Sequence, residues 1–484
     1  MKVAIIGCGV TGMSAGITLQ KAGIDTVIFE QTDKPGGVIT VYKRGDILIN
    51  NAMEFVYGTK NGTFINDMWN SLGMFRTEPV HKDCFNKFSW DGNTVGIYKD
   101  FGKTVNELIS LGQEDKKSMD KLHKAVKRFQ KVELPFITKN STDIFSRLVR
   151  LFFDCLAASP YVLRYGLVNG KKYSKRLKSE KLRSFFSGAL NQERSLLQYL
   201  VLWSFYSAGN FSVPDNNQKE MVENLYNEYT FHGGRVEFCS KLTDISIIDG
   251  KINSLNFSDI TETDFDYVIF SGDIATVNEI MNNSGKKLPI IEKAMEKEHI
   301  TSACMLYFKV NEDISSYDLD NLSIHTSPFT VGGRSCSEFS VRTMKNPGAG
   351  VSVISVTLYQ NEKDYPFWQN IAEKGKGEYR KECERIAENV SSAIEEHFPV
   401  LKGKLENIEA VTPLTYHSFT GVNKGGWMPE SWNPLLYLFY GRGHMPGIRN
   451  ASLAGQKMFP IGGSTIGAFS GVHLAERLIK KKKH

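Results

Sequence analysis

Hydrophobic and polar positions at the start of the chain change period twice, which predicts a strand, a helix and a second strand. Residues 2–6 (KVAII) are a continuous apolar run, typical of a buried parallel strand. Residues 11–23 (TGMSAGITLQKAG) carry apolar positions at helical spacing and end at a glycine. Residues 24–30 (IDTVIFE) are again strand-like and end in Glu30. This order of elements predicts a parallel sheet of the α/β class.

A glycine-rich turn joins the first strand to the helix. Gly7, Gly9 and Gly12 fit the pattern G-x-G-x-x-G, and Glu30 follows Gly12 by 18 positions. In a dinucleotide-binding, Rossmann-like unit the glycines permit the tight turn, the approach of a pyrophosphate and close packing of helix on sheet. The helix N-terminus offers N–H groups to phosphates, and the acid accepts hydrogen bonds from ribose hydroxyls. We predict an ADP site lacking a 2′-phosphate, against the alternative of a strand-helix-strand unit that binds no ligand.

The remaining pattern predicts a discontinuous two-domain chain. Residues 76–207 are mostly helical in pattern, whereas residues 298–360 contain alternating runs that suit an antiparallel sheet. At the C-terminus five apolar positions are spaced for one buried helix face: Ile466, Phe469, Val472, Ala475 and Ile479. We expect a nucleotide-binding domain from 1–75, 208–275 and 405–484, and a second domain, a sheet with a helical cover, from 76–207 and 276–404.

Composition changes this picture little. The chain has 484 residues, of which 41% are hydrophobic and 23% charged, as in ordinary globular proteins. Its seven cysteines are scattered and form no C-x-x-C pair, which predicts reduced thiols, a cytoplasmic location and no zinc site. Neither a signal-peptide pattern nor an apolar run of about 18 residues is present, so neither a leader nor a membrane span is expected.

Positive charge is concentrated in one segment, although the formal net charge is only +6. From Ser146 to Phe186 there are ten Lys or Arg against two acids, and four lysines, Lys480 to Lys483, lie at the end of the sequence. A basic amphipathic cover is a candidate for contact with an anionic membrane surface, which would make the protein peripheral on the inner face of the membrane. The alternative is a solvated pair of basic helices. Nucleic-acid binding is not expected, because no recognised module accompanies the charge.

A second glycine pair, Gly36-Gly37, follows the acid and precedes a predicted hairpin over residues 38–50 that turns at residues 44–46. This segment resembles the FAD-dependent amine oxidase and phytoene desaturase superfamily, and most closely its phytoene-dehydrogenase-related branch of carotenoid desaturases, carotenoid isomerases and retinol saturases. The resemblance continues in family order through residues 50–74, 207–245, 266–277 and 454–481. The chain departs from the family pattern at Val38, Asn50-Asn51, Glu54-Phe55 and Gln456.

The resemblance implies that FAD is the cofactor, bound by residues from both ends of the chain. Carried over position by position, the binding residues are Gly7, Gly9, Val10, Thr11, Gly12, Glu30, Gln31, Gly36, Gly37, Val38, Leu242, Gly455, Gln456, Gly462, Gly463, Thr465, Ile466 and Ala468. It also places Leu242 against the adenine and the N-terminus of the C-terminal helix at the pyrimidine end of the flavin. A positive helix end there would stabilise charge on the reduced flavin.

The resemblance further implies an oxidoreductase that desaturates or saturates a C–C bond of an apolar polyene, isoprenoid or lipid-like substrate, with hydride transfer at flavin N5. The candidate base is Glu54, with His325 and His417 as further candidates, although a single ionisable residue is more often structural. Five aromatic residues are candidates for the substrate pocket or for ordinary core: Phe55, Tyr57, Trp90, Tyr416 and Trp427.

Two other functions stay open at this point. One is an amine-oxidase-like reaction at a C–N bond of a small metabolite. The other is a non-redox isomerase or binding protein in which FAD is mainly structural. No metal is expected, no Ser-His-Asp order or acid pair demands a different reaction, and the sequence does not indicate the oligomeric state.

Overall fold

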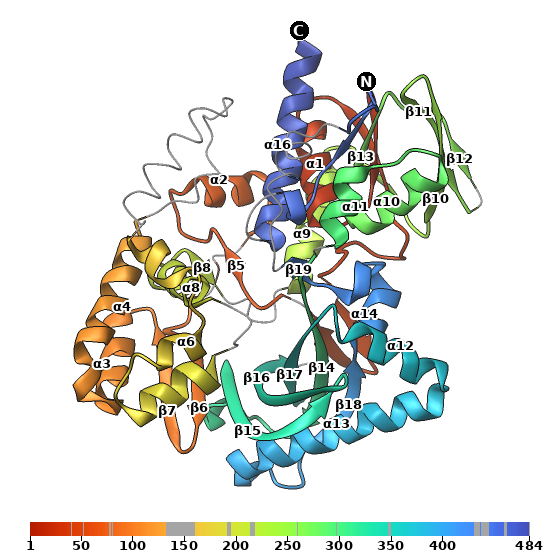
Figure 1. The fold of residues 1–484 in the computed structure, drawn as a ribbon. Coiled ribbons are helices and arrows are strands. Elements are labelled where there is room, and N and C mark those ends of the chain that lie inside the picture. The colour runs from red at the N-terminus through yellow and green to blue at the C-terminus, as the bar shows by residue number, and fades with distance from the viewer. Residues whose placement is uncertain are drawn as a thin grey trace.

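Two sheet-based regions make up the computed structural model, and both chain termini lie in the same region (Figure 1). The structure describes residues 1–484 except 40, 52, 77–78, 80, 132–159, 191–194, 213–217, 259, 297, 347–349, 430–435, 437–444, 459–461 and 484. Element labels follow Figure 1, and structural statements below concern the described residues.

The first region is built on a five-stranded parallel sheet with strand order β20-β13-β1-β2-β9. Its strands are β1 (Lys2–Ile6), β2 (Asp25–Phe29), β9 (Arg235–Glu237), β13 (Tyr267–Phe270) and β20 (Ala451–Leu453). The helices of this region are α1 (Val10–Lys21), α2 (Phe64–Ser71), α9 (Gln218–Phe231), α10 (Ile274–Asn283), α11 (Pro289–Glu296) and α16 (Ser464–Lys483). The predicted α/β class and the strand-helix-strand start are confirmed, because β1 and β2 are buried, parallel and joined through α1.

A small antiparallel sheet is attached to this region through β10 (Leu242–Ile248), β11 (Lys251–Phe257) and β12 (Thr261–Glu262). The C-terminal helix α16 crosses α1 at close range. A Cβ atom at Gly471 would lie 2.3 Å from the backbone oxygen of Thr11, and one at Gly467 would lie 2.7 Å from its Oγ1. Only glycine fits these two positions, so the end of the chain packs directly on the helix that follows the glycine turn.

The second region contains an eight-stranded sheet with order β18-β14-β17-β16-β15-β6-β7, in which β19 also pairs with β14. Its strands are β6 (Cys84–Trp90), β7 (Asn93–Tyr98), β14 (Ile300–Val310), β15 (Leu322–Val331), β16 (Arg334–Asn346), β17 (Val351–Asn361), β18 (Glu406–Val411) and β19 (Met428–Pro429). All pairs are antiparallel except β15 with β6. The antiparallel sheet predicted within residues 298–360 is therefore confirmed.

The two faces of the large sheet are covered differently. One face buries Leu306, Val341 and Ile354 against α12 (Tyr365–Glu373) and α13 (Lys376–His397). The other face packs in part on the hairpin of β3 (Val41–Arg44) and β4 (Ile47–Asn50), whose Ile49 lies in a cluster with Met305. This hairpin and its turn are those predicted from the sequence.

A helical cover faces the rest of that side of the sheet. It consists of α3 (Phe101–Leu111), α4 (Lys116–Phe129), α6 (Gly170–Ser174), α7 (Glu180–Ser184), α8 (Leu196–Ser207), η1 (Gln113–Asp115) and the π-helical turn η2 (Phe185–Ala189). Further elements are β5 (Val56–Tyr57), β8 (Phe211–Ser212), α14 (Pro413–Thr420), η3 (Ser315–Tyr317), η4 (Pro399–Leu401), η5 (Asn423–Gly425) and η6 (Gln456–Met458). Figure 1 shows this helical cover beside the eight-stranded sheet of the second region, away from the parallel sheet of the first region.

One element type and two boundaries differ from those expected. The strands β6 and β7 lie within residues 76–207, where mostly helices were expected, and they extend the large sheet. The strand β18 follows residue 405 yet pairs with β14, so the first region resumes later in the chain. Most of α10 and all of α11 lie after residue 275, but these helices bury Val277 and Ile291 in the core of the parallel sheet. In each case long-range pairing or burial decides which region a segment joins.

Candidate functional site

The glycine turn after β1 has the geometry that a close ligand approach requires. Gly7 has φ +108°, a conformation that favours glycine, and its N–H donates to the carbonyl of Phe29 at 2.8 Å. A Cβ at Gly12 would lie 2.0 Å from the Gly7 oxygen, so no other residue fits there. Helix α1 begins at Val10 without a side-chain cap and without an acid in its first turn. Its first N–H groups therefore keep the partial positive charge that binds phosphate.

Glu30 lies at the end of β2 and is buried beside this turn. Its Oε2 accepts from the N–H of Cys8 at 2.7 Å, and its Oε1 accepts from the N–H and Oγ1 of Thr32, both at 2.9 Å. Burial, with a smaller contribution from Glu30, raises the pKa of the Cys8 thiol, which therefore stays protonated. The carboxylate is thus fixed at the carboxyl end of the sheet with acceptor capacity left for hydroxyl groups.

The second glycine pair packs against the first turn. The N–H of Gly36 donates to the carbonyl of Cys8 at 2.9 Å, and a Cβ at Gly37 would lie 3.1 Å from the Cα of Gly9. The neighbouring Val38 offers its carbonyl to the hydroxyl of Tyr416. The two glycine segments, which lie apart in sequence, form one backbone surface.

The start of α16 is held by Gln456. Its Oε1 accepts from the N–H of Gly463 at 2.7 Å and its Nε2 donates to the carbonyl of Trp427 at 2.8 Å. The hydroxyl of Thr465 donates to the carbonyl of Tyr57 at 3.1 Å. The N-terminus of α16 is therefore fixed against the segment that follows the hairpin, and the flavin contacts predicted for residues 455–468 stay a prediction.

The other predicted cofactor residues occupy the same region or its supports. Thr11 lies in the first turn of α1, Gly455 follows β20, and Gly462 packs on Pro429. Leu242, Ile466 and Ala468 are buried in the core of the first region. Gln31 is exposed and donates to the carbonyl of Thr420 at 2.9 Å.

Buried polar atoms test whether these residues fit a flavin dinucleotide. The Oδ1 atoms of Asn50 and Asn51 and the Nε1 of Trp427 are buried without a hydrogen-bond partner among the described residues. Such atoms are rare in folded proteins unless a ligand or water pairs them. Together with the glycine surface and Glu30, they provide backbone donors, an acid for ribose and polar groups beyond it. The residues present fit FAD.

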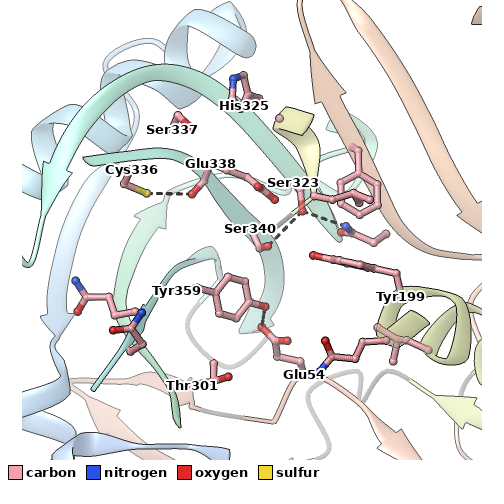
Figure 2. A pocket seen from close by; sticks show the side chains of 18 of the residues that line it. Glu54, Tyr199, Thr301, Ser323, His325, Cys336, Ser337, Glu338, Ser340 and Tyr359 are labelled. Carbon is pink, nitrogen blue, oxygen red and sulfur yellow. Dashed lines mark hydrogen bonds between the residues drawn. The ribbon is translucent and has the colours of Figure 1, made fainter. Parts of the chain in front are cut away.

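A cavity of about 860 Å³ lies between the large sheet and the helical cover. The strands β6, β15, β16 and β17, the helix α8 and the segment containing Glu54 and Phe55 line it. Figure 2 shows Glu54 and Tyr359 pointing toward one another across this space, with Ser323 and Ser340 between them and His325. Its volume suits an organic substrate of moderate size.

Glu54 reaches this cavity from the segment that follows the β3-β4 hairpin. Tyr359 donates its hydroxyl to Glu54 Oε1 at 2.6 Å. Arg342 donates to the backbone oxygen of Glu54 at 2.7 Å, and its Nη2 lies 3.9 Å from Glu54 Oε2. The carboxylate is therefore held in one orientation by two residues of the sheet, while its side chain keeps about one fifth of its surface exposed.

The sequence model of the family described as flavin containing amine oxidoreductase matches residues 10–375. The chain belongs to this family. It is 23% identical over 336 residues to a phytoene desaturase (lycopene-forming) from Pseudescherichia vulneris, a match covering 64% of each chain. A shorter stretch of 74 residues is 36% identical to coproporphyrinogen III oxidase from Staphylococcus aureus and covers 15% of this chain and 16% of that protein. The chain thus spans less than two thirds of the length of these relatives.

Solved structures of several oxidoreductases share the fold. An oxidoreductase from Methanosarcina mazei has a TM-score of 0.59 at 14% identity, covering 99% of this chain and 100% of the other. Cyclohexylamine oxidase from Brevibacterium oxydans has a TM-score of 0.56 at 13% identity, covering 100% and 99%. A putative protoporphyrinogen oxidase from Exiguobacterium has a TM-score of 0.51 at 13% identity, covering 99% of each chain.

Only part of the aromatic pocket predicted from the sequence lines the cavity. Phe55 does, stacked on Phe211 with ring centroids 4.2 Å apart. Trp90 does not, because it packs on Phe185 in the core of the helical cover. Tyr57, Tyr416 and Trp427 are likewise absent from the described lining. The last two rings pack on one another beside the β3-β4 hairpin, with centroids 6.1 Å apart.

Of the two histidine candidates for the base, one lines the cavity and the other does not. His325 lines the cavity, and its Nδ1 is buried without a partner among the described residues. His417 lies outside the described lining, where its Nδ1 is 2.8 Å from the carbonyl of Val422.

Sequence reasoning missed most of the polar lining of the cavity. Glu338, Ser340 and Arg342 alternate along β16 with the buried Phe339 and Val341. That period-2 pattern was visible in the sequence and indicates one polar face. Tyr199, Ser323 and Tyr359 carry no comparable sequence signal, because other segments bring them to the cavity. The lining is mixed in polarity, whereas an apolar cavity was expected.

The described residues add two negative findings. No group of three or more His, Cys, Asp or Glu among them could hold a metal ion. No helix in the described ranges is both long enough and apolar enough to cross a membrane. Of the predicted basic segment, residues 146–159 lie outside the described residues, and its remaining lysines, 171, 172, 175, 178 and 181, are exposed.

Proposed function

We propose that this flavoprotein is an FAD-dependent oxidoreductase that desaturates or saturates a C–C bond of an organic substrate held in the cavity. One observation carries the proposal. The short segment from Asn50 to Tyr57 joins the two sites, because it offers Asn50 and Asn51 on the cofactor side and Glu54 and Phe55 in the cavity. Its last residue accepts a hydrogen bond from Thr465 at the start of α16. The similarity to a phytoene desaturase supports the reaction type.

The chain's own groups have separate tasks in this proposal. The N–H groups at the start of α1 bind the pyrophosphate, and Glu30 accepts from the ribose hydroxyls. Bound FAD supplies the two-electron acceptor or donor, which no side chain can replace. The N-terminus of α16 would stabilise negative charge on the reduced flavin.

Glu54 is the candidate group for proton transfer. Removal of a hydride from one carbon requires loss of a proton from its neighbour, and a carboxylate at the cavity wall can accept it. Tyr359 and Arg342 hold that carboxylate at a fixed position. Less conformational entropy of the carboxylate is therefore lost on reaching the transition state. Phe55, with Trp203 of α8, excludes water from the same wall.

Binding of the cofactor is tested first, with the pair Glu30→Gln and Asp33→Asn. Each removes one negative charge, but Asp33 is exposed, whereas Glu30 is buried at the turn. We expect Glu30→Gln to weaken FAD binding about 10–100-fold, because a charged hydrogen-bond acceptor for ribose is lost, and Asp33→Asn to leave it unchanged. Purified protein that shows no flavin absorption after addition of FAD contradicts the proposal.

The reaction class is tested on the flavin-loaded protein. Anaerobic photoreduction followed by rapid mixing with polyene, imine and quinone acceptors reports which one reoxidises the flavin. Reoxidation by a C=C compound supports the proposal, and reoxidation by an imine alone supports the amine-oxidase alternative. A reduced flavin that none of them reoxidises favours a non-redox role.

We also propose that the helical cover contacts an anionic membrane surface. Helix α4 carries six Lys or Arg and one acid, and Lys171 and Lys172 of α6 are exposed. Leu163 and Leu167, between these helices in sequence, are 83% and 90% exposed. Exposed apolar side chains beside clustered positive charge support binding to anionic headgroups.

A further inference from the structure

The floor of the cavity is a polar face of an otherwise apolar sheet. On β16 Ser340 and Arg342 line the cavity, and Val341 between them also borders it but belongs to the buried apolar cluster of the sheet. On β15 the same alternation places Ser323 and His325 in the cavity and Ile324 in the core. Figure 2 shows His325, Ser323 and Ser340 in a row that continues to Tyr359 and Glu54. The floor therefore offers hydrogen-bonding groups along its length.

The opposite wall is mainly apolar and aromatic. Helix α8 contributes Leu202 and Trp203 beside the more polar Gln198 and Tyr199, and Phe55 and Phe85 contribute two more rings. The rings of Phe55 and Phe85 pack edge to face, with their centroids 6.3 Å apart. Aromatic packing therefore fixes the orientation of both rings. A molecule in this cavity meets aromatic carbon on one side and oxygen or nitrogen on the other.

Hydrogen bonds within the floor leave part of its capacity unused. Asn86 donates to Ser323 Oγ at 3.0 Å, and Ser323 shares one hydrogen bond of 3.3 Å with Ser340. Each serine hydroxyl has one donor and two acceptor positions. The hydrogen bonds from Asn86 through Ser323 to Ser340 therefore leave acceptor lone pairs of Ser340 unused. The Nδ1 of His325 is buried with no partner among the described residues. A hydrocarbon lying on this floor would remove water from these groups without replacing its hydrogen bonds, which weakens binding.

Charge in the lining is balanced. Its charged residues are Arg334, Arg342, Lys363, Glu54, Glu338 and Glu362. Two of the cations already have carboxylate partners, because Arg334 lies 3.1 Å from Asp364 and Arg342 lies 3.9 Å from Glu54. No excess of one sign is available to select an ionised substrate.

We propose that the substrate is an uncharged, oxygen-bearing amphiphile, with an apolar skeleton on one face and hydroxyl, carbonyl or amide groups along the other. The inference rests on the proposed function only in taking this cavity as the substrate site. The proposal excludes a pure hydrocarbon as the substrate. It also assigns Ser340 and His325 as residues that determine substrate specificity.

The test uses flavin-loaded protein and matched probes that differ only in polarity: decane with decanediol, and androstane with androstanediol. Binding is followed by the change in flavin absorption and in tryptophan fluorescence. We expect each diol to bind at least about tenfold more tightly than its hydrocarbon, and decanedioate to bind more weakly than decanediol. A diol that binds no more tightly than its hydrocarbon, including a diol that does not bind, overturns the proposal.

A variant pair locates the preference on the floor. Ser340→Ala is expected to reduce the preference for the diol about two- to tenfold, because one hydroxyl partner is lost. Ser327→Ala, an exposed serine on the same strand as Ser323, is the control and is expected to leave the preference unchanged. An unchanged preference in Ser340→Ala overturns the assignment to this floor. Flavin content is measured on the same samples, so failure of FAD binding contradicts the proposed function and is distinguished from a wrong substrate class.

Discussion

The predicted cofactor turn and the cavity of this protein are built in opposite ways. The turn depends on backbone geometry within one short stretch, where Gly7, Gly12 and Gly36 leave no room for side chains. The cavity depends on side chains that distant segments bring together, as in the bond between Glu54 and Tyr359, which lie 305 positions apart. A local backbone site can be recognised from sequence, whereas a site made of distant side chains requires the fold.

The largest effect is expected where the two regions meet. Lys457 lies in the turn after β20, and its Nζ contacts Asp273 after β13 at 3.2 Å and Glu298 before β14 at 2.5 Å. Lys457→Met leaves two buried carboxylates without their cation, and we expect a loss of about 3–5 kcal/mol of unfolding free energy, measured with denaturant. Lys404→Met removes a more exposed lysine that pairs with Glu312 and should cost less than about 1 kcal/mol. Equal losses would show that the charged contact between the regions contributes little.

This contact also predicts the pH dependence of stability. Burial lowers the pKa of Lys457, but Asp273 and Glu298 outweigh it, so the pKa is raised above that of the unfolded chain. The contribution is therefore complete below the unfolded-state pKa and is lost as pH rises through the higher folded-state pKa. Unfolding curves of the wild type should lose stability on the alkaline side of pH 10.5 more steeply than those of Lys457→Met.

Gly12→Ala tests the backbone site. The added Cβ would meet the Gly7 oxygen at 2.0 Å, so the turn must move. We expect a loss of about 1–3 kcal/mol together with loss of bound FAD, measured by thermal unfolding and flavin content. Gly377→Ala in α13 has open space around the new atom and should be neutral or slightly stabilising. A Gly12→Ala protein with normal FAD content would contradict the claim that the cofactor site depends on the backbone geometry of the glycine turn.

Tyr359→Phe tests the side-chain site. It removes the hydroxyl that holds Glu54 and leaves the ring in place. We expect kcat for the substrate that the wild type turns over to fall about tenfold, with flavin content and thermal stability unchanged. Tyr317→Phe removes a hydroxyl that donates to Glu312 outside the described lining, and kcat should not change. A fall in stability without a fall in kcat would make Tyr359 a structural residue.

The smallest effect per residue concerns the surface of the cover. Replacing Lys171 and Lys172 with alanine should reduce binding to anionic vesicles by about 1 kcal/mol for each charge, measured by flotation at low salt. Lys374 and Lys376 are exposed in the other part of the second region and provide the matched control pair. Wild-type protein that does not float with phosphatidylserine vesicles at low salt contradicts the membrane proposal.

The sequence alone determined the start of the first region of this protein. The apolar runs of β1 and β2, the glycines between them and Glu30 lie within 30 residues, and their spacing permits one arrangement because short connections fix parallel neighbours. The hairpin of β3 and β4 was predicted for the same reason, since its turn and alternation are local.

Only the tertiary structure decided the cavity. It placed Phe55 in the lining but buried Trp90 and Tyr416 elsewhere, although all three have similar hydrophobicity in the sequence. It also brought β18 and the β6-β7 hairpin into one sheet and set Tyr359 opposite Glu54. Hydrophobic burial is non-directional, so a sequence pattern shows that an aromatic residue is buried but not which cluster it joins. The partners of a side chain are fixed only when strands from distant segments pair in one register.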